Sequence, residues 1–272
     1  RQRRLNQVGE TISSIAAPKA AYSLRSITGG DPKAVRVRRD TGGAAGDDDE
    51  EDFTVSQINS GALVAFVGSG NDGFVSKWYD QSGNSNDALQ STAANQPKIV
   101  DSGSLNASGG LEFDGTNDIL TLTSSISFQN KAAYVIALQD GQDSVNDYTL
   151  GVSGDNRGLG FKSNKTRWFF TTNVIDIDNS SVQTGQKLYT ALHDGTTNDP
   201  NVKSYVNGSE IVDSSPDSDQ GEANSSSAAD QIGARRTLSF LEGTLTELII
   251  YDTDQTNNRA ALETEIINHY GL

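Results

Sequence analysis

Residues 73–90, GFVSKWYDQSGNSNDALQ, are the segment most informative about the fold. An apolar run that ends in Trp78 and Tyr79 predicts a β-strand. A cluster of oxygen-bearing side chains around Gly83 follows the strand at once. Its members are Asp80, Ser82, Asn84, Asn86 and Asp87.

Two interpretations of this cluster stay open. In the first, Asp80 and Asn84 bind backbone N–H groups in a tight turn. In the second, Asp80, Asn84 and Asn86 hold a structural Ca²⁺ together with a carboxylate from Asp114 or Asp118, since Ca²⁺ prefers oxygen ligands. An EF-hand is excluded, because its twelfth position would be a serine and no flanking helices are predicted.

Short alternating segments continue in both directions from this stretch, separated by Gly, Asn, Asp and Ser. We predict strands at 34–40, 73–80, 131–139, 158–162, 166–172, 187–194, 202–208 and 245–252. Asn207-Gly208 predicts a two-residue hairpin turn. The final segment has apolar residues at helical spacing and predicts a short helix that stops at Gly271. The fold class is therefore all-β, a jelly-roll sandwich with a short C-terminal helix.

We predict one domain over residues 21–272, preceded by an arm or linker at residues 1–20. The acidic runs at 40–52, 140–147 and 213–230 predict solvated loops. Within the arm, residues 11–16 predict at most two helical turns before Pro18. The absence of methionine, including an initiator, indicates a piece of a longer polypeptide.

The charge excludes some partners. With 21 Lys and Arg against 36 Asp and Glu among 272 residues, the net charge is −15. Such a surface is repelled by nucleic-acid phosphates and by anionic membranes. No apolar run is long enough to insert into a membrane. The chain has no cysteine, so disulfides are excluded.

Two sets of motifs resemble known families. KSYVNGSEIVDSS (203–215), QIGAR (231–235) and EGTLTELIIYDTDQT (242–256), with LEFDGTNDILTL (111–122), resemble laminin G-like, concanavalin A-like jelly rolls. The segments 20–40 and 74–100 are similar to the start of the catalytic domain of fungal-type α-L-arabinofuranosidases. They also resemble phage and bacterial surface proteins, including tail fibres, that carry the same module. The resemblance implies a fold; activity does not follow from a fold.

Catalytic residues are poorly supported by the sequence. Jelly-roll glucanases place two outer carboxylates on one strand as nucleophile and acid/base. Glu112 and Asp114 fit the first two places of that motif, but Asn117 occupies the third, so the motif lacks a proton donor. Zinc chemistry is disfavoured, because the only histidines are His193 and His269 and they have no ligand spacing.

Sugar binding is the remaining candidate, since aromatic rings and polar side chains together recognise sugars. Trp78, Tyr79, Arg167 and Trp168 are the candidate ligand-binding residues, although a Trp in a strand also suits a core. We expect a non-catalytic structural or adhesion module on a virion or cell surface, or otherwise extracellular, that binds glycans such as host-surface polysaccharide. The resemblance implies a homo-oligomer, commonly a trimer, or assembly with other virion proteins. The alternative is an arabinofuranosidase-like glycoside hydrolase.

Overall fold

The computed structural model describes residues 11–42, 49–129, 132–140, 147–162, 165–168, 175–178, 184–193, 202–212, 228–236 and 238–272. All strand pairings in these ranges are antiparallel. Most of the acidic loops at 40–52, 140–147 and 213–230, and the first ten residues of the expected arm, lie outside them.

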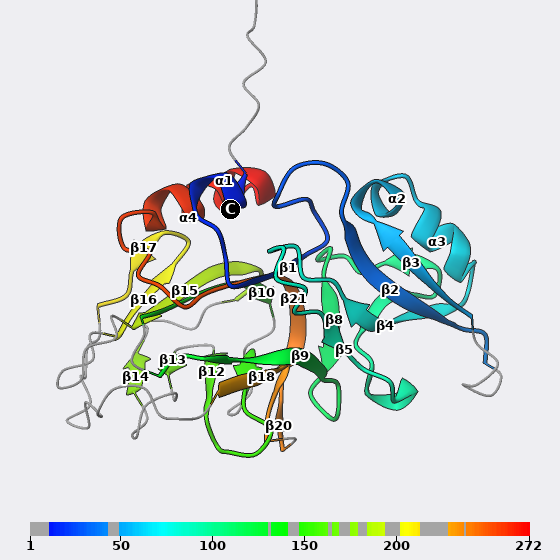
Figure 1. Cartoon of the computed structure of the whole chain (residues 1–272). Coiled ribbons are helices and arrows are strands. Elements are labelled where there is room, and N and C mark those ends of the chain that lie inside the picture. Colours follow the sequence, from blue (N-terminus) through cyan, green and yellow to red (C-terminus); the bar gives the residue numbers. More distant parts are fainter. Residues whose placement is uncertain are drawn as a thin grey trace, which may run out of the picture.

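The first sheet has the strand order β3–β2–β4–β6–β8–β21–β10–β15–β16–β17 (Figure 1). Its strands are β2 (Lys33–Asp40), β3 (Glu50–Thr54), β4 (Asp72–Trp78), β6 (Lys98–Asp101), β8 (Leu111–Asp114), β10 (Ala133–Asp140), β15 (Lys187–His193), β16 (Val202–Val206), β17 (Ser209–Glu210) and β21 (Glu242–Tyr251). Two further strands join it: β1 (Ala20–Ser23) pairs with β21, and β7 (Ser104–Leu105) pairs with β6.

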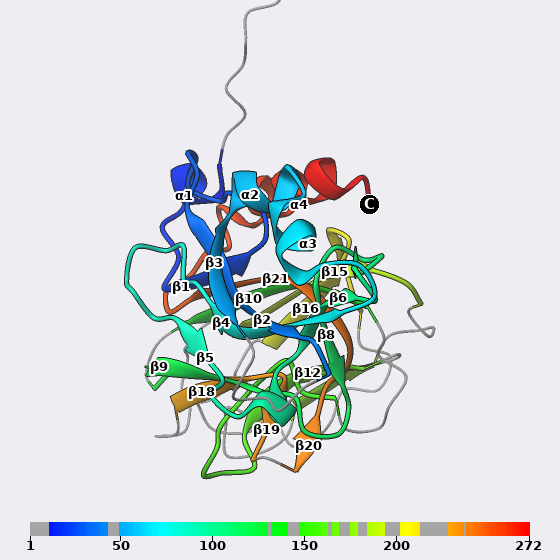
Figure 2. The same cartoon turned by 90° about the vertical axis from the view of Figure 1, so that its right-hand side faces the viewer.

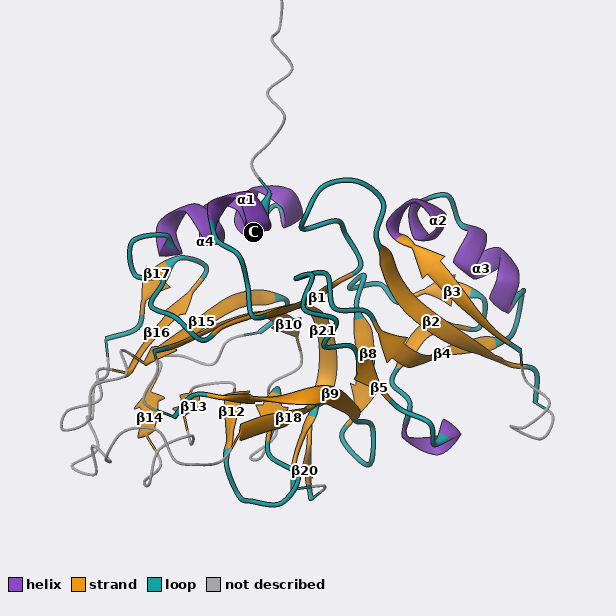
Figure 3. Cartoon of the chain, in the orientation of Figure 1, coloured by secondary structure: helices purple, strands orange, loops and turns teal. Residues whose placement is uncertain are grey.

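The second sheet has the order β5–β9–β18–β11–β12–β13–β14 and lies across from the first (Figure 3). Its strands are β5 (Ala88–Leu89), β9 (Leu120–Ser127), β11 (Leu150–Gly151), β12 (Gly158–Lys162), β13 (Lys165–Trp168), β14 (Ile175–Asp178) and β18 (Ala228–Ile232). β5 also pairs with β4, so the two sheets are joined at one corner. A small ribbon of β19 (Ala234–Arg235) and β20 (Ser239–Phe240) completes the strands.

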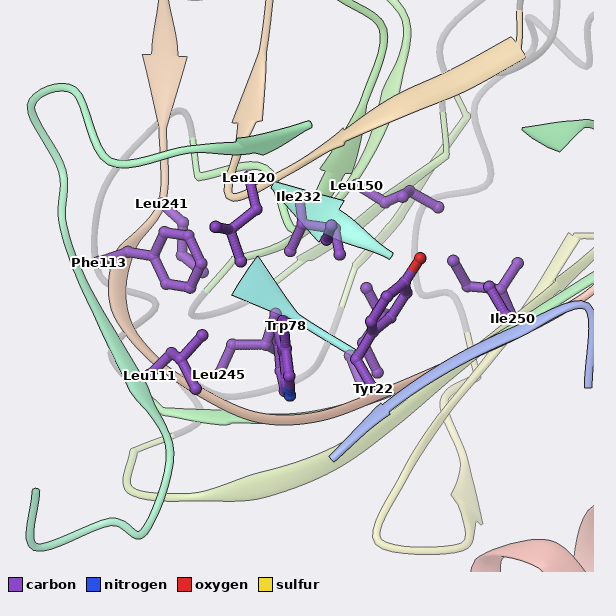
Figure 4. Packing of buried hydrophobic residues seen from close by; sticks show 14 of the residues in the cluster. Tyr22, Trp78, Leu111, Phe113, Leu120, Leu150, Ile232, Leu241, Leu245 and Ile250 are labelled. Atoms are coloured by element: carbon purple, nitrogen blue, oxygen red, sulfur yellow. The ribbon is translucent and has the colours of Figure 1, made fainter. Parts of the chain in front are cut away.

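The main core lies between the two sheets. Figure 4 shows Trp78 and Tyr22 facing side chains from both layers. The labelled residues of this cluster are Tyr22, Trp78, Leu111, Phe113, Leu120, Leu150, Ile232, Leu241, Leu245 and Ile250. The predicted all-β sandwich is confirmed.

Helices cover the outer side of the first sheet. In Figure 2, α1 (Ile12–Ile15), α2 (Val55–Asn59) and α4 (Arg259–Tyr270) lie on one side of the molecule, opposite the β19–β20 ribbon. A second apolar cluster lies under α1 and α4 and includes Ile12, Ile136 and Ile266. β10 therefore has both faces covered, since Val135 faces the main core while Ile136 faces the helices.

The turn chemistry follows the sequence where glycine is required. Asn207 and Gly208 have φ of 47° and 79° and connect Val206 to Ser209, as the predicted hairpin needs. Gly271 has φ of 71° and ends α4, as predicted.

Two helices were not predicted. α2 begins with a capping box between Thr54 and Gln57, and α3 (Ala62–Val67) follows at once. α3 reads ALVAFV, an apolar run too short to distinguish a helix from a strand by periodicity. The last residues of the acidic run at 40–52 also form part of β3, where Asp52 pairs with Lys33 and Arg36.

Candidate functional site

A cavity of about 470 Å³ opens over the first sheet. Its lining combines both signs of charge with one aromatic ring. The lining residues are Arg38, Asp40, Phe74, Ala93, Ala94, Gln96, Lys98, Glu112, Asp114 and Asp118. Ala93 and Ala94 belong to the short 3₁₀ helix η2 (Ala93–Asn95).

One row of directly paired residues crosses this cavity. Arg38 on β2 is opposite Phe74 on β4, Phe74 is opposite Lys98 on β6, and Lys98 is opposite Glu112 on β8. Directly opposed residues place their side chains on the same face of a sheet. Val37, next to Arg38, is buried in the core, as alternation along a strand requires. The register of four strands therefore builds the site.

The loop after β8 brings a further carboxyl group into the cavity. Asp114 Oδ1 accepts hydrogen bonds from the backbone N–H groups of Thr116 (2.8 Å) and Asn117 (3.1 Å), which forms a tight turn. Asp118 Oδ2 then accepts a hydrogen bond from the backbone N–H of Asp114 (3.0 Å). The turn thus folds Asp118 back beside Asp114.

Asp118 has an unusual proton affinity for an aspartate. Its side chain is only 6% exposed. Burial raises the pKa of Asp118 to about 7, and the charges of Asp114 and Glu112 act in the same direction. The hydrogen bond from Asp114 and the charge of Lys98 oppose the rise in pKa. At neutral pH a large fraction of Asp118 is therefore protonated and able to donate a hydrogen bond or a proton.

Cations balance part of this acidity. Burial acts to lower the pKa of Lys98, but the charges of Glu112 and Asp101 and a hydrogen bond to Asp101 raise it overall. Arg38 Nε donates a hydrogen bond to Gln96 Oε1 (2.8 Å), and the guanidinium lies 4.9 Å from the centre of the Phe74 ring. The cavity therefore presents donors from Arg38 and Lys98 and acceptors from its carboxyl groups beside the Phe74 ring.

This arrangement can do two things chemically. Hydrogen-bond donors and acceptors beside an aromatic ring suit the hydroxyl groups and carbon face of a sugar. A protonated carboxyl group beside carboxylates also matches the acid and base of glycosidases. Within the described ranges, no group of three or more His, Cys, Asp or Glu side chains is arranged to hold a metal ion.

The Asp80 loop has a different role from this cavity. Asp80 Oδ1 accepts hydrogen bonds from the backbone N–H groups of Ala21 and Ser82, both at 2.9 Å. Asp80 Oδ2 accepts from the Ser82 hydroxyl (2.7 Å) and the backbone N–H of Asn86 (3.0 Å). The carboxylate is thus surrounded by protein donors that tie β1 to the end of β4.

The other expected calcium ligands also have protein partners. The Asn84 amide donates to the carbonyl oxygen of Lys19 (3.0 Å), and Asn86 Oδ1 accepts from the backbone N–H of Ser124 (2.7 Å). Asp114 lines the cavity and does not join them. These contacts support the turn interpretation, and a Ca²⁺ ion at this loop stays a prediction.

Both expected tryptophans lie in the core. Trp78 and Trp168 are each 0% exposed, and their rings pack against Tyr22 (centroids 5.6 Å apart) and Phe128 (6.0 Å). Neither indole can contact a surface ligand in this arrangement.

Tyr79 directly follows β4 of the first sheet, and Arg167 lies in β13 of the second sheet, so the two residues do not form one binding surface. The Tyr79 hydroxyl donates to Asp52 Oδ1 (2.7 Å). Arg167 forms a two-point ion pair with Asp176, with its Nε 2.6 Å from Asp176 Oδ1. Both side chains are engaged in contacts that stabilise the fold.

Most of the cavity was not predicted from the sequence. Position 117 lacks a carboxylate, and Asp118 stands one residue further on in the same motif. Asp118 was named only as an alternative calcium ligand, and the turn that Asp114-Gly115 predicts is the signal that would have placed it beside Asp114 in the cavity. The contribution of Arg38, Phe74 and Lys98 depends on strand register, which no local pattern reveals.

The fold and the cavity define an all-β sandwich with a polar, partly acidic pocket, and solved structures share this fold. A GH54 α-L-arabinofuranosidase soaked with a cyclic sulfate inhibitor superposes with a TM-score of 0.58 at 12% sequence identity, over 92% of this chain and 62% of that one. An arabinofuranosidase complexed with arabinofuranosyl-α-1,2-xylobiose gives a TM-score of 0.56 at 13% identity, with the same coverage. At this identity the likeness concerns the fold alone.

This chain therefore spans about 62% of the length of those arabinofuranosidases. No protein-family model matches the sequence, and no curated protein matches it. Among the residues that the structure describes, no helix has the length and apolar character to cross a membrane.

Proposed function

We propose that this protein is a non-catalytic adhesion module that binds a glycan in the cavity around Glu112. The observation that carries the proposal is the row Arg38–Phe74–Lys98–Glu112, which presents donors, an aromatic ring and acceptors on one face. Ordered polar side chains of this kind are what sugar hydroxyls require. The fold shared with arabinofuranosidases supports a carbohydrate ligand as well.

We further propose that the module acts on the surface of a virion or cell, in assembly with identical copies or other surface proteins. The net charge of −15 and the lack of cysteine suit an exposed position. The resemblance of segments 20–40 and 74–100 to tail-fibre and other surface proteins supports the same context. Light scattering on the purified chain tests the oligomeric part, since a trimer has three times the monomer mass.

A glycan array followed by calorimetry with the bound glycans tests the binding. Glu112→Gln and Lys98→Met each remove one charged partner from the row without adding volume. We expect each to weaken binding about tenfold or more, because hydrogen bonds to charged groups contribute roughly 1.5–3 kcal/mol. Glu51→Gln, at an exposed position on β3, is the matched control and should bind as the wild type does. Equal affinity of all four proteins would refute this cavity as the site.

Glycoside hydrolysis is the second candidate, and Asp118 favours it. A carboxyl group with a pKa near 7 beside Glu112 supplies the proton donor that the motif at 112–117 lacks. In that case Asp118 would protonate the leaving oxygen, and Glu112 or Asp114 would act as base or nucleophile.

Aryl α-L-arabinofuranosides and mixed polysaccharides test this candidate. Release of sugar that disappears in both Asp118→Asn and Glu112→Gln would establish the enzyme and overturn the non-catalytic proposal. Binding of a glycan with no release of sugar over long incubation would support adhesion alone.

A further inference from the structure

We propose that the glycan site is an extended trough that binds several consecutive rings of a linear, uncharged glycan chain, not a single terminal sugar. This inference rests on the proposed function and adds the class of ligand. It is carried by the strand register beyond the first cavity and by a second cavity beside it.

The row of paired residues does not stop at Glu112. Glu112 on β8 is directly opposite Thr244 on β21. The full row is therefore Arg38, Phe74, Lys98, Glu112 and Thr244, on five neighbouring strands. Four inter-strand spacings give this row a length of about 19 Å. A single sugar ring fills only part of that length.

A second cavity continues the first. It has a volume of about 310 Å³ and is lined by Asp101, Ser104, Leu105, Asn106, Ala107, Ser108, Glu112 and Thr244. Glu112 lines both cavities, so the two adjoin at its side chain. Both are open to solvent, as a chain that enters at one end and leaves at the other requires.

The wall of the second cavity is held in place before any ligand binds. The Asn106 amide donates to the carbonyl oxygens of Lys98 (2.8 Å) and Gly110 (3.2 Å). The Gln186 amide donates to the carbonyl oxygen of Ser108 (3.1 Å) and so ties the same loop to the sheet. A preformed wall lowers the entropy lost on binding, which favours a binding surface over an unused loop.

The charges of the trough select an uncharged chain. Its cations are Arg38 and Lys98, and its carboxyl groups are Asp40, Asp101, Glu112, Asp114 and Asp118. Acidic groups remain in excess even with Asp118 protonated. Glycans that carry uronate or sulfate groups are therefore repelled, whereas hydroxyl groups can bind both kinds of side chain.

Calorimetry with neutral oligosaccharide ladders tests the trough. We would use gluco-, xylo- and arabino-oligosaccharides from two to six rings, with polygalacturonate as the anionic probe. In the ladder that binds, we expect six rings to bind about tenfold more tightly than two, because each added ring brings hydrogen bonds. Polygalacturonate should not bind.

Ala107→Trp is the decisive variant, because Ala107 is exposed and lines only the second of these two cavities. It should leave the affinity for two rings unchanged and remove the gain from two to six rings. Ala260→Trp, at an exposed position on α4, is the matched control and should behave as the wild type.

The outcomes separate this inference from the proposed function. Equal affinity for two and six rings, or no effect of Ala107→Trp on the longer chains, overturns the trough while leaving a glycan site at Glu112. Stronger binding of polygalacturonate than of every neutral ladder overturns the uncharged ligand. No binding of any ladder or of polygalacturonate, together with a glycan array without hits, overturns both proposals.

Discussion

Replacing Asp118 by asparagine should make the protein more stable above neutral pH, because it removes a buried carboxylate while keeping an oxygen acceptor. The pKa of this carboxyl group is raised from its ordinary value of 3.8 to about 7, first by burial and then by the charge of Asp114. Between these two pH values the folded chain binds a proton that the unfolded chain has lost. Stability due to Asp118 is therefore complete below pH 3.8 and is lost as pH rises through 7.

The size of the effect on the free energy of unfolding follows from the difference between the two pKa values of Asp118. Each pH unit corresponds to about 1.4 kcal/mol, so the interval from 3.8 to about 7 corresponds to roughly 4 kcal/mol. Because the cavity is open to water, we expect about half of this, or ~2 kcal/mol, in a measured free energy of unfolding. The asparagine carbonyl can still accept the hydrogen bond from Asp114 N–H.

Urea unfolding of the wild type and Asp118→Asn at pH 5, 6, 7 and 8 measures the effect. The difference between the two proteins isolates this one group from all others that titrate. The variant should gain relative to the wild type as pH rises, whereas Glu51→Gln should show a flat difference. A flat difference for Asp118→Asn as well would show that this carboxyl group ionises at an ordinary pH, and the proton-donor role would fall with it.

Three further substitutions test contacts that stabilise the fold: the Asp80 loop, the Arg25–Glu247 ion pair and the packing at Gly233. Asp80→Ala should lower the free energy of unfolding by roughly 2–4 kcal/mol, since it leaves buried N–H groups without an acceptor. EDTA separates the two interpretations of this loop: a lower wild-type melting temperature would support Ca²⁺, and an unchanged one would support the turn alone. Arg25→Met should cost about 3–5 kcal/mol in urea unfolding because it leaves Glu247, 1% exposed, without its cation; no loss would mean that the pair contributes little. Gly233→Ala should destabilise the fold by more than about 2 kcal/mol, because φ of Gly233 is +82° and an added Cβ would clash with the Phe113 ring. Gly154→Ala meets no neighbour and is the control in thermal melting. Equal melting temperatures of the two variants would contradict this packing.

Local chemistry allowed much of the fold to be predicted. The Asn207-Gly208 hairpin and the end of α4 at Gly271 follow from residues that tolerate positive φ. The dense aromatic and β-branched runs became β4, β10 and β21. α2 and α3 were missed because each has only five or six residues, too few for helical periodicity to be read from the sequence, and because tertiary contacts outweigh the weak local signal.

The site was harder to predict because distant segments form it. Glu112 and Asp114 were identified as candidates from one motif, and they do line the cavity. Trp78 and Trp168 were predicted to bind a ligand because they are aromatic residues near polar loops, but both side chains are buried in the core of the sandwich. Alternation within a strand separates its two faces, but whether an aromatic side chain lies in the core also depends on which other sheet covers that face, and the residues of one strand do not show this.

The pairing of β1 with β21 affects folding during synthesis on the ribosome. Ser23 in β1 bonds Glu247 in β21, and 224 residues separate them in the sequence. At a synthesis rate of 5–20 residues per second, the first strand waits roughly 10–45 s on the ribosome before its partner exists. During that time the backbone N–H and C=O groups along its edge are unpaired, and nascent chains that meet there can pair wrongly. The yield of folded protein should therefore depend on ribosome-bound chaperones as well as on the stability of the folded protein.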